Sequence, residues 1–471
     1  MLKKILFLFA LVGKITFAQA QSIVIKNTNV ITMESEAILW NHDVYIDGDT
    51  ITSIIPTKSF QADQYFLIDG TDKYLIPGLS DMHAHFVSDD RIDSKHLYTE
   101  IEIPLVYGIT QMRVMIGKPE HLKIREEINK DEILGPTLFL ASPQLAGFSF
   151  TKVFNGQIVK TYEEAFEAVK KYKEQGYDFI KITFGVNDEA YSGLTKAGQE
   201  FDIPIIGHVP REEVLRSIKS GQDIEHLDQY LDGILSDDTP TKVGLSAFGL
   251  FQEESWETIA FIDTLKLNRI VDLTIESNIW NTPTNYFFVS SFARKRTLEE
   301  LNNSPEWTWF SSEVRNELLS YRTPYWESPP PKEQREKYIK IRGIIIKKIF
   351  EKNGQILAGS DAPEWLNLYG LGLHRELQSL VYDANLTPFQ ALQTATTKPA
   401  EYLQLDNTGY IKQGFVANLV LLEANPLNRI DHTSKIAGLV YKGKWLPKKE
   451  LQGKLTAAKN KLKKVSLLDN P

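Results

Sequence analysis

The chain has 471 residues, and its 42% hydrophobic and 24% charged content is typical of a folded globular protein and unlike a disordered one. Its 61 acidic and 53 basic residues leave a net charge of −8, which argues against a nucleic-acid binder, because such proteins neutralise phosphates with lysine and arginine. The length predicts one large domain with a smaller companion, or one elaborated barrel. Without cysteine, stability must come from core packing, bound metal or assembly, so a homo-oligomer stays open.

Residues 1–20 have the layout of a secretory signal peptide. Lys3 and Lys4 precede an apolar run at 5–12, and Ala18-Gln19-Ala20 suits cleavage after Ala20. The apolar run is about half of the roughly 20 residues that a membrane-spanning helix needs. We therefore expect export to the periplasm or the medium after cleavage, with no stable membrane insertion; an uncleaved anchor is the alternative.

The N-terminal and C-terminal flanks of the chain share one pattern of apolar and polar residues. Short alternating runs at 23–25, 43–46 and 50–54 are joined by turn residues such as Asp47-Gly48-Asp49, which is typical of antiparallel hairpins. Similar runs return at 415–423 and 436–443. We predict that residues 22–76 and 408–447 form one discontinuous β-sandwich domain, and that the lysine-rich tail 448–471 contains an amphipathic surface helix.

Between the flanks, residues 77–407 alternate β-like apolar runs with polar helical stretches, as in 163–175 followed by 179–183. This pattern predicts an α/β fold, a (β/α)₈ TIM barrel whose chemistry lies at the carboxyl ends of its strands. A segment at 280–331 holds four of the eight tryptophans. It is interpreted as a lid, a dimer contact or a packed helical excursion.

Histidines mark the first of these strand ends. In Asp81-Met82-His83-Ala84-His85, side chains alternate along a strand, so His83 and His85 point the same way and can reach one cation. Two histidines on a polar strand face are the alternative. His208 and His226 each follow a strand-like run, 18 residues apart, which accommodates one barrel step.

Two further ionisable residues stand in apolar strands. Lys181 lies within 179–184, where an unpaired ammonium is costly to bury. It forms a salt bridge, or it reacts with carbon dioxide to give a carbamate that bridges two metals. Asp361 ends the run 356–360 and is either a metal ligand or a helix cap.

The chain resembles the amidohydrolase superfamily, in particular its imidazolonepropionase-like and prolidase-like branch. The resemblance covers nearly the whole mature chain. It is carried by motifs at 77–85 (Pro-Gly-Leu-x-Asp-Met-His-x-His), 207–210 (Gly-His-Val-Pro), 221–226 (Gly-Gln-Asp-Ile-Glu-His), 358–362 (Ala-Gly-Ser-Asp-Ala), 392–403 (around Ala-Thr-x-x-Pro-Ala) and 414–422 (Gly-x-x-Ala-Asn-Leu-Val-Leu-Leu).

The resemblance implies a binuclear centre, with zinc as the expected metal. His83, His85 and Asp361 would hold the more buried ion, His208 and His226 the outer ion, and carboxylated Lys181 would bridge them. A metal-activated hydroxide would then split an amide-type C–N bond of a dipeptide, an N-acyl amino acid or a cyclic amide, with Asp361 shuttling the proton.

Some positions depart from the family pattern or carry weaker predictions. His208-Val209-Pro210 stands where many relatives have His-Ala-His, and residues 145–149 replace a glycine-rich segment, which leaves the substrate open between small molecules and short peptides. Tyr230, four residues beyond His226, is the candidate substrate contact, with a surface or packing role as the alternative, whereas Arg113 is interpreted as structural. The competing functions are a deaminase of the same superfamily, which Lys181 disfavours, and a non-catalytic periplasmic binding protein on a retired barrel.

Overall fold

The computed structural model describes residues 22–58, 64–89, 91–149, 156–210, 214–240, 244–245, 249–294, 298–320 and 329–468. The predicted leader at 1–20 lies outside them, as does Trp326 of the aromatic segment. Within these ranges no helix is both long and apolar enough to cross a bilayer.

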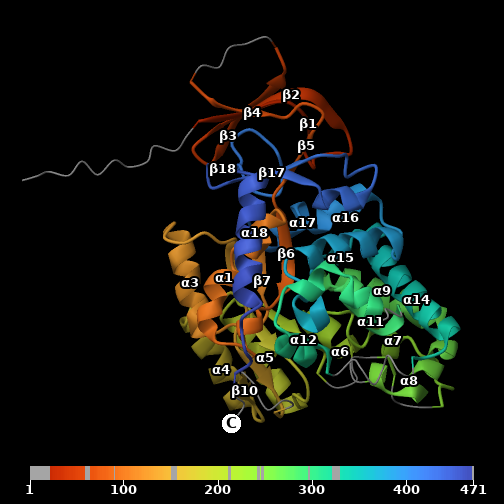
Figure 1. The fold of residues 1–471 in the computed structure, drawn as a ribbon. Coiled ribbons are helices and arrows are strands. Elements are labelled where there is room, and N and C mark those ends of the chain that lie inside the picture. Colours follow the sequence, from red (N-terminus) through yellow and green to blue (C-terminus); the bar gives the residue numbers. More distant parts are fainter. Residues whose placement is uncertain are drawn as a thin grey trace, which may run out of the picture.

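Both ends of the chain build one β domain, drawn at the top of Figure 1 in red and blue. The N-terminal strands are β1 (Ile23–Ile31), β2 (Ile38–Asp47), β3 (Thr50–Pro56), β4 (Phe66–Asp69) and β5 (Tyr74–Pro77), and the C-terminal ones are β16 (Leu419–Leu422), β17 (Ile436–Tyr441) and β18 (Lys444–Pro447). They form a single eight-stranded sheet in the order β18-β17-β16-β5-β1-β2-β3, with β4 paired to β1. The antiparallel pair β5–β16 joins the two flanks.

The sequence explains this sheet. Alternating apolar residues, among them Ile25, Val44, Ile46, Leu75 and Leu421, meet in one buried cluster. Gly48 has a φ of +62° in the tight turn between β2 and β3, a conformation that glycine adopts without a side-chain clash. The two ends of the chain therefore form one separate sheet, as predicted.

The middle of the chain forms a closed barrel of eight parallel strands. These are β6 (Leu79–Ala84), β7 (Ile109–Val114), β8 (Thr137–Leu140), β11 (Ile180–Ile182), β12 (Ile205–Gly207), β13 (Asp223–Glu225), β14 (Trp280–Thr282) and β15 (Gln355–Ile356). Parallel bridges at Ala141–Phe179 and Ala84–Ala362 connect the two strand groups and close the ring. This confirms the predicted (β/α)₈ fold. Two short strands, β9 (Gln144–Ala146) and β10 (Gly156–Ile158), extend the sheet beside β11.

Helices surround the barrel (Figure 1). They are α1 (Leu97–Glu100), α2 (Ile103–Val106), α3 (Pro119–Asn129), α4 (Tyr162–Glu174), α5 (Asp188–Glu200), α6 (Val214–Ser220), α7 (Tyr230–Gly233), α8 (Glu253–Glu257), α9 (Thr264–Glu276), α14 (Lys332–Glu351), α15 (Leu371–Tyr382), α16 (Pro388–Thr394) and α17 (Thr397–Tyr402). Helix α4, predicted over 163–175, begins with a reciprocal capping box between Thr161 and Glu164.

The aromatic segment is a helical excursion between β14 and α14. It contains α10 (Asn285–Phe288), a π-helical turn η5 (Val289–Ala293), α11 (Leu298–Asn302) and α12 (Ser312–Leu319). The tail forms α18 (Lys448–Leu462), which buries Leu451, Ala458 and Leu462 and pairs Lys454 Nζ with Glu102 Oε2 at 3.4 Å. The predicted surface helix is thus docked on the barrel.

Candidate metal centre

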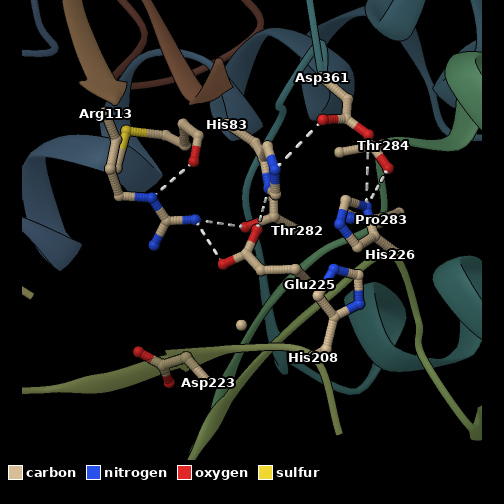
Figure 2. A network of polar contacts seen from close by, with 12 residues as sticks. His83, Arg113, His208, Asp223, Glu225, His226, Thr282, Pro283, Thr284 and Asp361 are labelled. Atoms are coloured by element: carbon tan, nitrogen blue, oxygen red, sulfur yellow. Dashed lines mark hydrogen bonds and ion pairs between the residues drawn. The ribbon is translucent and has the colours of Figure 1, made fainter. Parts of the chain in front are cut away.

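Three buried side chains from three barrel strands converge at one point. His83 lies on β6, His226 directly follows β13, and Asp361 lies beyond β15. Each offers a ligand atom, and these atoms all lie within 4.8 Å of one another. Figure 2 shows the Asp361 carboxylate between the two imidazoles, 3.3 Å from His83 Nε2 and 3.8 Å from His226 Nδ1.

The backbone presents Asp361 to this point. Its N–H donates to the His83 carbonyl oxygen at 2.7 Å, which ties the eighth strand to the first. The carboxylate faces the histidines, and the next helical turn is held by the Asp361 backbone carbonyl, which accepts from Glu364 N at 3.1 Å. Burial would raise the pKa of Asp361, but His83 and His226 outweigh it and hold the pKa well below its usual range. The geometry thus favours a ligand over a helix cap.

Neighbouring residues hold His226 through its backbone and through its imidazole ring. Its φ of +67° is left-handed, and its N–H donates to the Thr282 carbonyl oxygen at 2.7 Å. Nδ1 lies 2.8 Å from Thr284 Oγ1, and Arg342 Nη1 donates to the His226 carbonyl oxygen at 3.0 Å. A bulky residue keeps this conformation only where its surroundings impose it.

Glu225 orients His83. Its Oε2 lies 2.6 Å from His83 Nδ1, and its Oε1 accepts from Arg113 Nη2 at 2.6 Å. Although burial alone raises the pKa of Glu225, Arg113 and then His83 bring it down to about 2. An ionised carboxylate at Nδ1 fixes the ring so that Nε2 faces the centre, the usual support of a metal-binding histidine. Figure 2 shows this chain of contacts.

The other two predicted histidines lie beside this group. His85 Nε2 is 3.3 Å from Asp361 Oδ1. The His208 ring lies 4.9 Å from the His226 ring and 4.2 Å from the Phe184 ring, and its Nδ1 is 3.4 Å from Asp228 Oδ2. Burial lowers the pKa of His208, which favours the neutral imidazole that metals require.

Lys181 is buried in the middle of β11, with 3% of its surface exposed. Its stem passes over Gly207, where an added Cβ would lie 3.1 Å from Lys181 Cδ. Burial lowers the pKa of Lys181 to about 8, while the nearby carboxylates of Glu225 and Asp361 act in the opposite direction. Only a neutral amine reacts with carbon dioxide, and the lowered pKa favours that form, whereas the nearby carboxylates favour the charged form. The environment is therefore compatible with both alternatives for Lys181, the carbamate and the salt bridge.

Tyr230 does not line this group of residues. It begins α7, is fully buried in the hydrophobic core, and its hydroxyl lies 2.9 Å from Thr274 Oγ1. These contacts are those of the packing alternative for Tyr230. Although it follows His226 by four residues, its ring lies in the core. Arg113 is fully buried and binds Glu225, as expected of a structural residue.

Sequence reasoning did not identify the residues that hold the ligands. Glu225 and Arg342 are the clearest examples, and Thr284 is a third. For Glu225 a signal existed, since a carboxylate at the end of a short buried strand requires a partner. Arg342 lies on α14, 116 residues from His226, and its contact could not be read from spacing.

The donor chemistry fits a divalent cation. Imidazole nitrogens and carboxylate oxygens are ligands that zinc prefers, and Asp361 is 5% exposed among the histidines. The three convergent residues therefore fit the metal that the resemblance implies.

Comparison with known proteins shows the family of this chain. The model of the Amidohydrolase family matches residues 74–446. The chain belongs to the amidohydrolase family. A dihydroorotase of Carboxydothermus hydrogenoformans is 22% identical over 419 residues, covering 85% of this amidohydrolase and 88% of the relative.

Two solved structures share the fold. A bottromycin amidohydrolase superposes with a TM-score of 0.72 at 18% identity, covering 94% of this chain and 90% of its own. An Xaa-Pro dipeptidase with methionine bound in its active site superposes with a TM-score of 0.62 at 20% identity, covering 91% of this chain and 100% of its own. At these identities the likeness extends to the fold alone.

Proposed function

We propose that this amidohydrolase uses two divalent cations to hydrolyse an amide-type C–N bond of a small substrate, such as a dipeptide, an N-acyl amino acid or a cyclic amide. The observation that carries the proposal is the buried convergence of His83, His226 and Asp361 at the carboxyl ends of three barrel strands. Barrel enzymes assemble their catalytic residues at this face. A binding protein without catalytic activity would not require this set of metal ligands.

The residues of the chain have distinct tasks in the proposed reaction. Bound divalent cations supply Lewis acidity, which polarises a carbonyl and lowers the pKa of water. Asp361 accepts the proton of the attacking water and returns it to the leaving nitrogen. Glu225 keeps His83 oriented through Nδ1, and Thr284 does the same for His226.

A second cation is proposed because of His208 and Lys181. The His208 ring lies beside the His226 ring and adds a further imidazole to the candidate ligands. Lys181 is buried in β11, which lies in the sequence between His83 and His85 on one side and His208 and His226 on the other. The neutral amine of Lys181 would combine with carbon dioxide and release one proton, which gives a carbamate with two oxygens for two ions. The partition of ligands between an inner and an outer ion stays a prediction.

The test is a hydrolysis screen of the zinc-loaded protein against dipeptides, N-acyl amino acids, lactams and hydantoins. We expect elemental analysis to find about two zinc ions per chain, and turnover to disappear with a chelator and return with zinc. One ion at full occupancy together with ammonia release from an amino-substituted ring would favour a deaminase. Absence of metal under every reconstitution would support the binding protein instead.

We further propose that the chain is exported. The support is the arrangement of lysines, apolar run and Ala18-Gln19-Ala20 in the first 20 residues. N-terminal sequencing of the protein recovered from the cell envelope should begin at Gln21. An intact Met1 on a cytoplasmic protein would contradict export without affecting the proposed chemistry.

A further inference from the structure

An aromatic cluster extends outward from the candidate metal centre. It consists of Phe251, Phe287, Phe288, Phe292 and Trp365. The ring centroid of Phe288 lies 5.3 Å from that of His226, and Phe292 follows at 5.8 Å from Phe288. Trp365 lies 4.8 Å from Phe292 and 5.5 Å from Phe287, and Phe251 lies 5.4 Å from Phe292 and 5.8 Å from Trp365. The cluster therefore starts against a metal-ligand candidate.

Three different loops supply these rings, and all three follow barrel strands at the face that holds the histidines. Phe251 belongs to η3 (Gly249–Phe251), which lies beyond β13. The phenylalanines of α10 and η5 follow β14, and Trp365 lies in η7 (Glu364–Leu366), four residues after Asp361. Loops at this face of a barrel set the specificity of the enzyme, while its strands carry the chemistry.

Two observations concern the outer end of the cluster. First, the cluster begins in the hydrophobic core and ends in solvent: Phe288 and Phe292 are 6% and 4% exposed and belong to the core, whereas Trp365 is partly exposed and Phe251 is 47% exposed. Because Trp365 and Phe251 are in ring contact, they form adjacent accessible apolar surface rather than a single scattered residue.

Secondly, the backbone of the cluster is irregular. Trp365 has a left-handed φ of +47°, an unfavourable conformation for a bulky residue. Phe292 lies in a π-helical turn, a feature that is frequent at functional sites. Both features are common at active sites and ligand-binding sites, where the surrounding structure imposes them.

We propose that the aromatic cluster is the subsite for an apolar, preferably aromatic, group of the substrate next to the bond that is cleaved. This inference rests on the proposed function, because the metal centre defines where that bond lies. None of the five side chains carries a charge, and the guanidinium of Arg342 is already engaged over the Phe288 ring at 4.8 Å and with the His226 carbonyl oxygen. A phenylalanyl side chain would stack against Trp365 or Phe251 by the edge or face contacts that aromatic rings favour.

The first experiment measures binding without turnover. Phenylalanine hydroxamate and serine hydroxamate carry the same chelating group and differ only in the side chain. With the zinc-loaded protein, calorimetry should give a dissociation constant at least about 10-fold lower for the phenylalanine compound, the range that an apolar pocket contributes. Trp365→Ala and Phe251→Ala should reduce this preference several-fold.

Matched controls are available on the β domain. Trp40 and Phe66 are 56% and 42% exposed on β2 and β4, so Trp40→Ala and Phe66→Ala remove the same side chains far along the chain from the centre and should keep the preference. Equal affinities of the two hydroxamates for the wild type would overturn the proposal. A Trp365→Ala variant that weakens both compounds equally would also overturn it, since that is the result of a structural role.

The second experiment compares kcat/KM for N-acetylphenylalanine and N-acetylserine. We expect the wild type to prefer the former. In Trp365→Ala the ratio of the two kcat/KM values should fall several-fold, while in the control variants Trp40→Ala and Phe66→Ala this ratio should equal that of the wild type. The two experiments separate the two proposals. If neither compound is hydrolysed but the hydroxamate preference is present and depends on Trp365, the aromatic subsite stands and the proposed reaction fails. If both are hydrolysed at equal kcat/KM, the reaction stands and the subsite fails.

Discussion

The β domain and the mouth of the barrel both contain non-glycine residues in the left-handed conformation, but the residue types differ. In the β domain these are Asn27, Asn41 and Asp72, with Met33 and Lys442 as exceptions. Asparagine and aspartate tolerate this conformation better than other residues. Asn27 and Asn41 lie at the register shifts of the β1–β2 pair, and Asp72 lies in the turn between β4 and β5. Here the residue type follows from the local backbone.

At the barrel mouth the left-handed residues have other side chains. They are His226, Leu227, Gln229, Thr284, Asp361 and Trp365. Only the aspartate suits the conformation, so the backbone there carries strain that local preferences do not explain. The difference indicates that the β domain is built for stability, whereas the mouth holds particular side chains at the cost of stability.

Buried polar groups follow the same division. In the β domain, Asp43 Oδ1 accepts from Asn27 N at 2.9 Å and from Thr57 Oγ1 at 2.6 Å, so local donors satisfy it. At the mouth, Asp361 faces His83, His85 and His226. If this second arrangement serves metal binding and chemistry, substitutions at the mouth should change metal affinity and turnover more than they change stability.

Lys181→Ala should have the largest effect. Removing a residue that only orients a metal ligand lowers metal affinity by up to about 100-fold. If the carbamate of Lys181 bridges both cations, its loss should lower metal affinity by more than this, and turnover should fall as well. Lys181→Glu should restore part of both, because it returns a carboxylate. Lys398, which pairs with Glu401 Oε2 at 2.9 Å, is the control, and Lys398→Ala should change only stability. Full metal content and normal turnover in Lys181→Ala would refute the carbamate.

Asp361→Asn should reduce turnover by about 10²-fold or more, the range for the loss of a general base. The amide keeps the shape of the carboxylate but cannot accept the proton, so the melting temperature should barely change. Turnover, zinc content and melting temperature of the variant are compared with the wild type. Near-normal turnover with a lower melting temperature would show that Asp361 only caps the following helical turn.

The sequence predicted those parts of the fold that depend on local residue preferences or on short repeating patterns of apolar and polar residues. The β domain, the barrel and the strand-end positions of His83, His226 and Asp361 follow from alternation, turn residues and apolar runs. Contacts that join distant elements were not predictable: Glu225 with His83 and Arg342 with His226 depend on how the closed barrel brings strands and helices together. The same holds for Tyr230, whose spacing from His226 said nothing about the direction of α7.

Arg342→Lys tests such a distant contact. The guanidinium donates to the His226 and Pro283 carbonyl oxygens at 3.0 and 2.8 Å and to Asn285 Oδ1 at 2.9 Å, a fork that lysine cannot reproduce. We expect zinc affinity, measured by competition with a chelator, to fall about 10-fold to 100-fold. Arg335 on the same helix binds the Ala293 carbonyl oxygen at 2.6 Å, and Arg335→Lys should leave zinc affinity unchanged. Unchanged affinity in both variants would limit Arg342 to packing.

The smallest effect is expected in the β domain, at Asn41, which is exposed and has a φ of +54°. Asn41→Ala should lower the free energy of unfolding by about 1 kcal/mol, because a Cβ without a polar side chain is disfavoured in the left-handed region. Asn41→Gly should cost less, since glycine adopts this conformation freely. Denaturant unfolding of the three proteins gives the order, and zinc content and turnover should be identical in all of them. A change of turnover in Asn41→Ala would mean that the β domain also shapes the centre, and the contrast between the two regions would not hold.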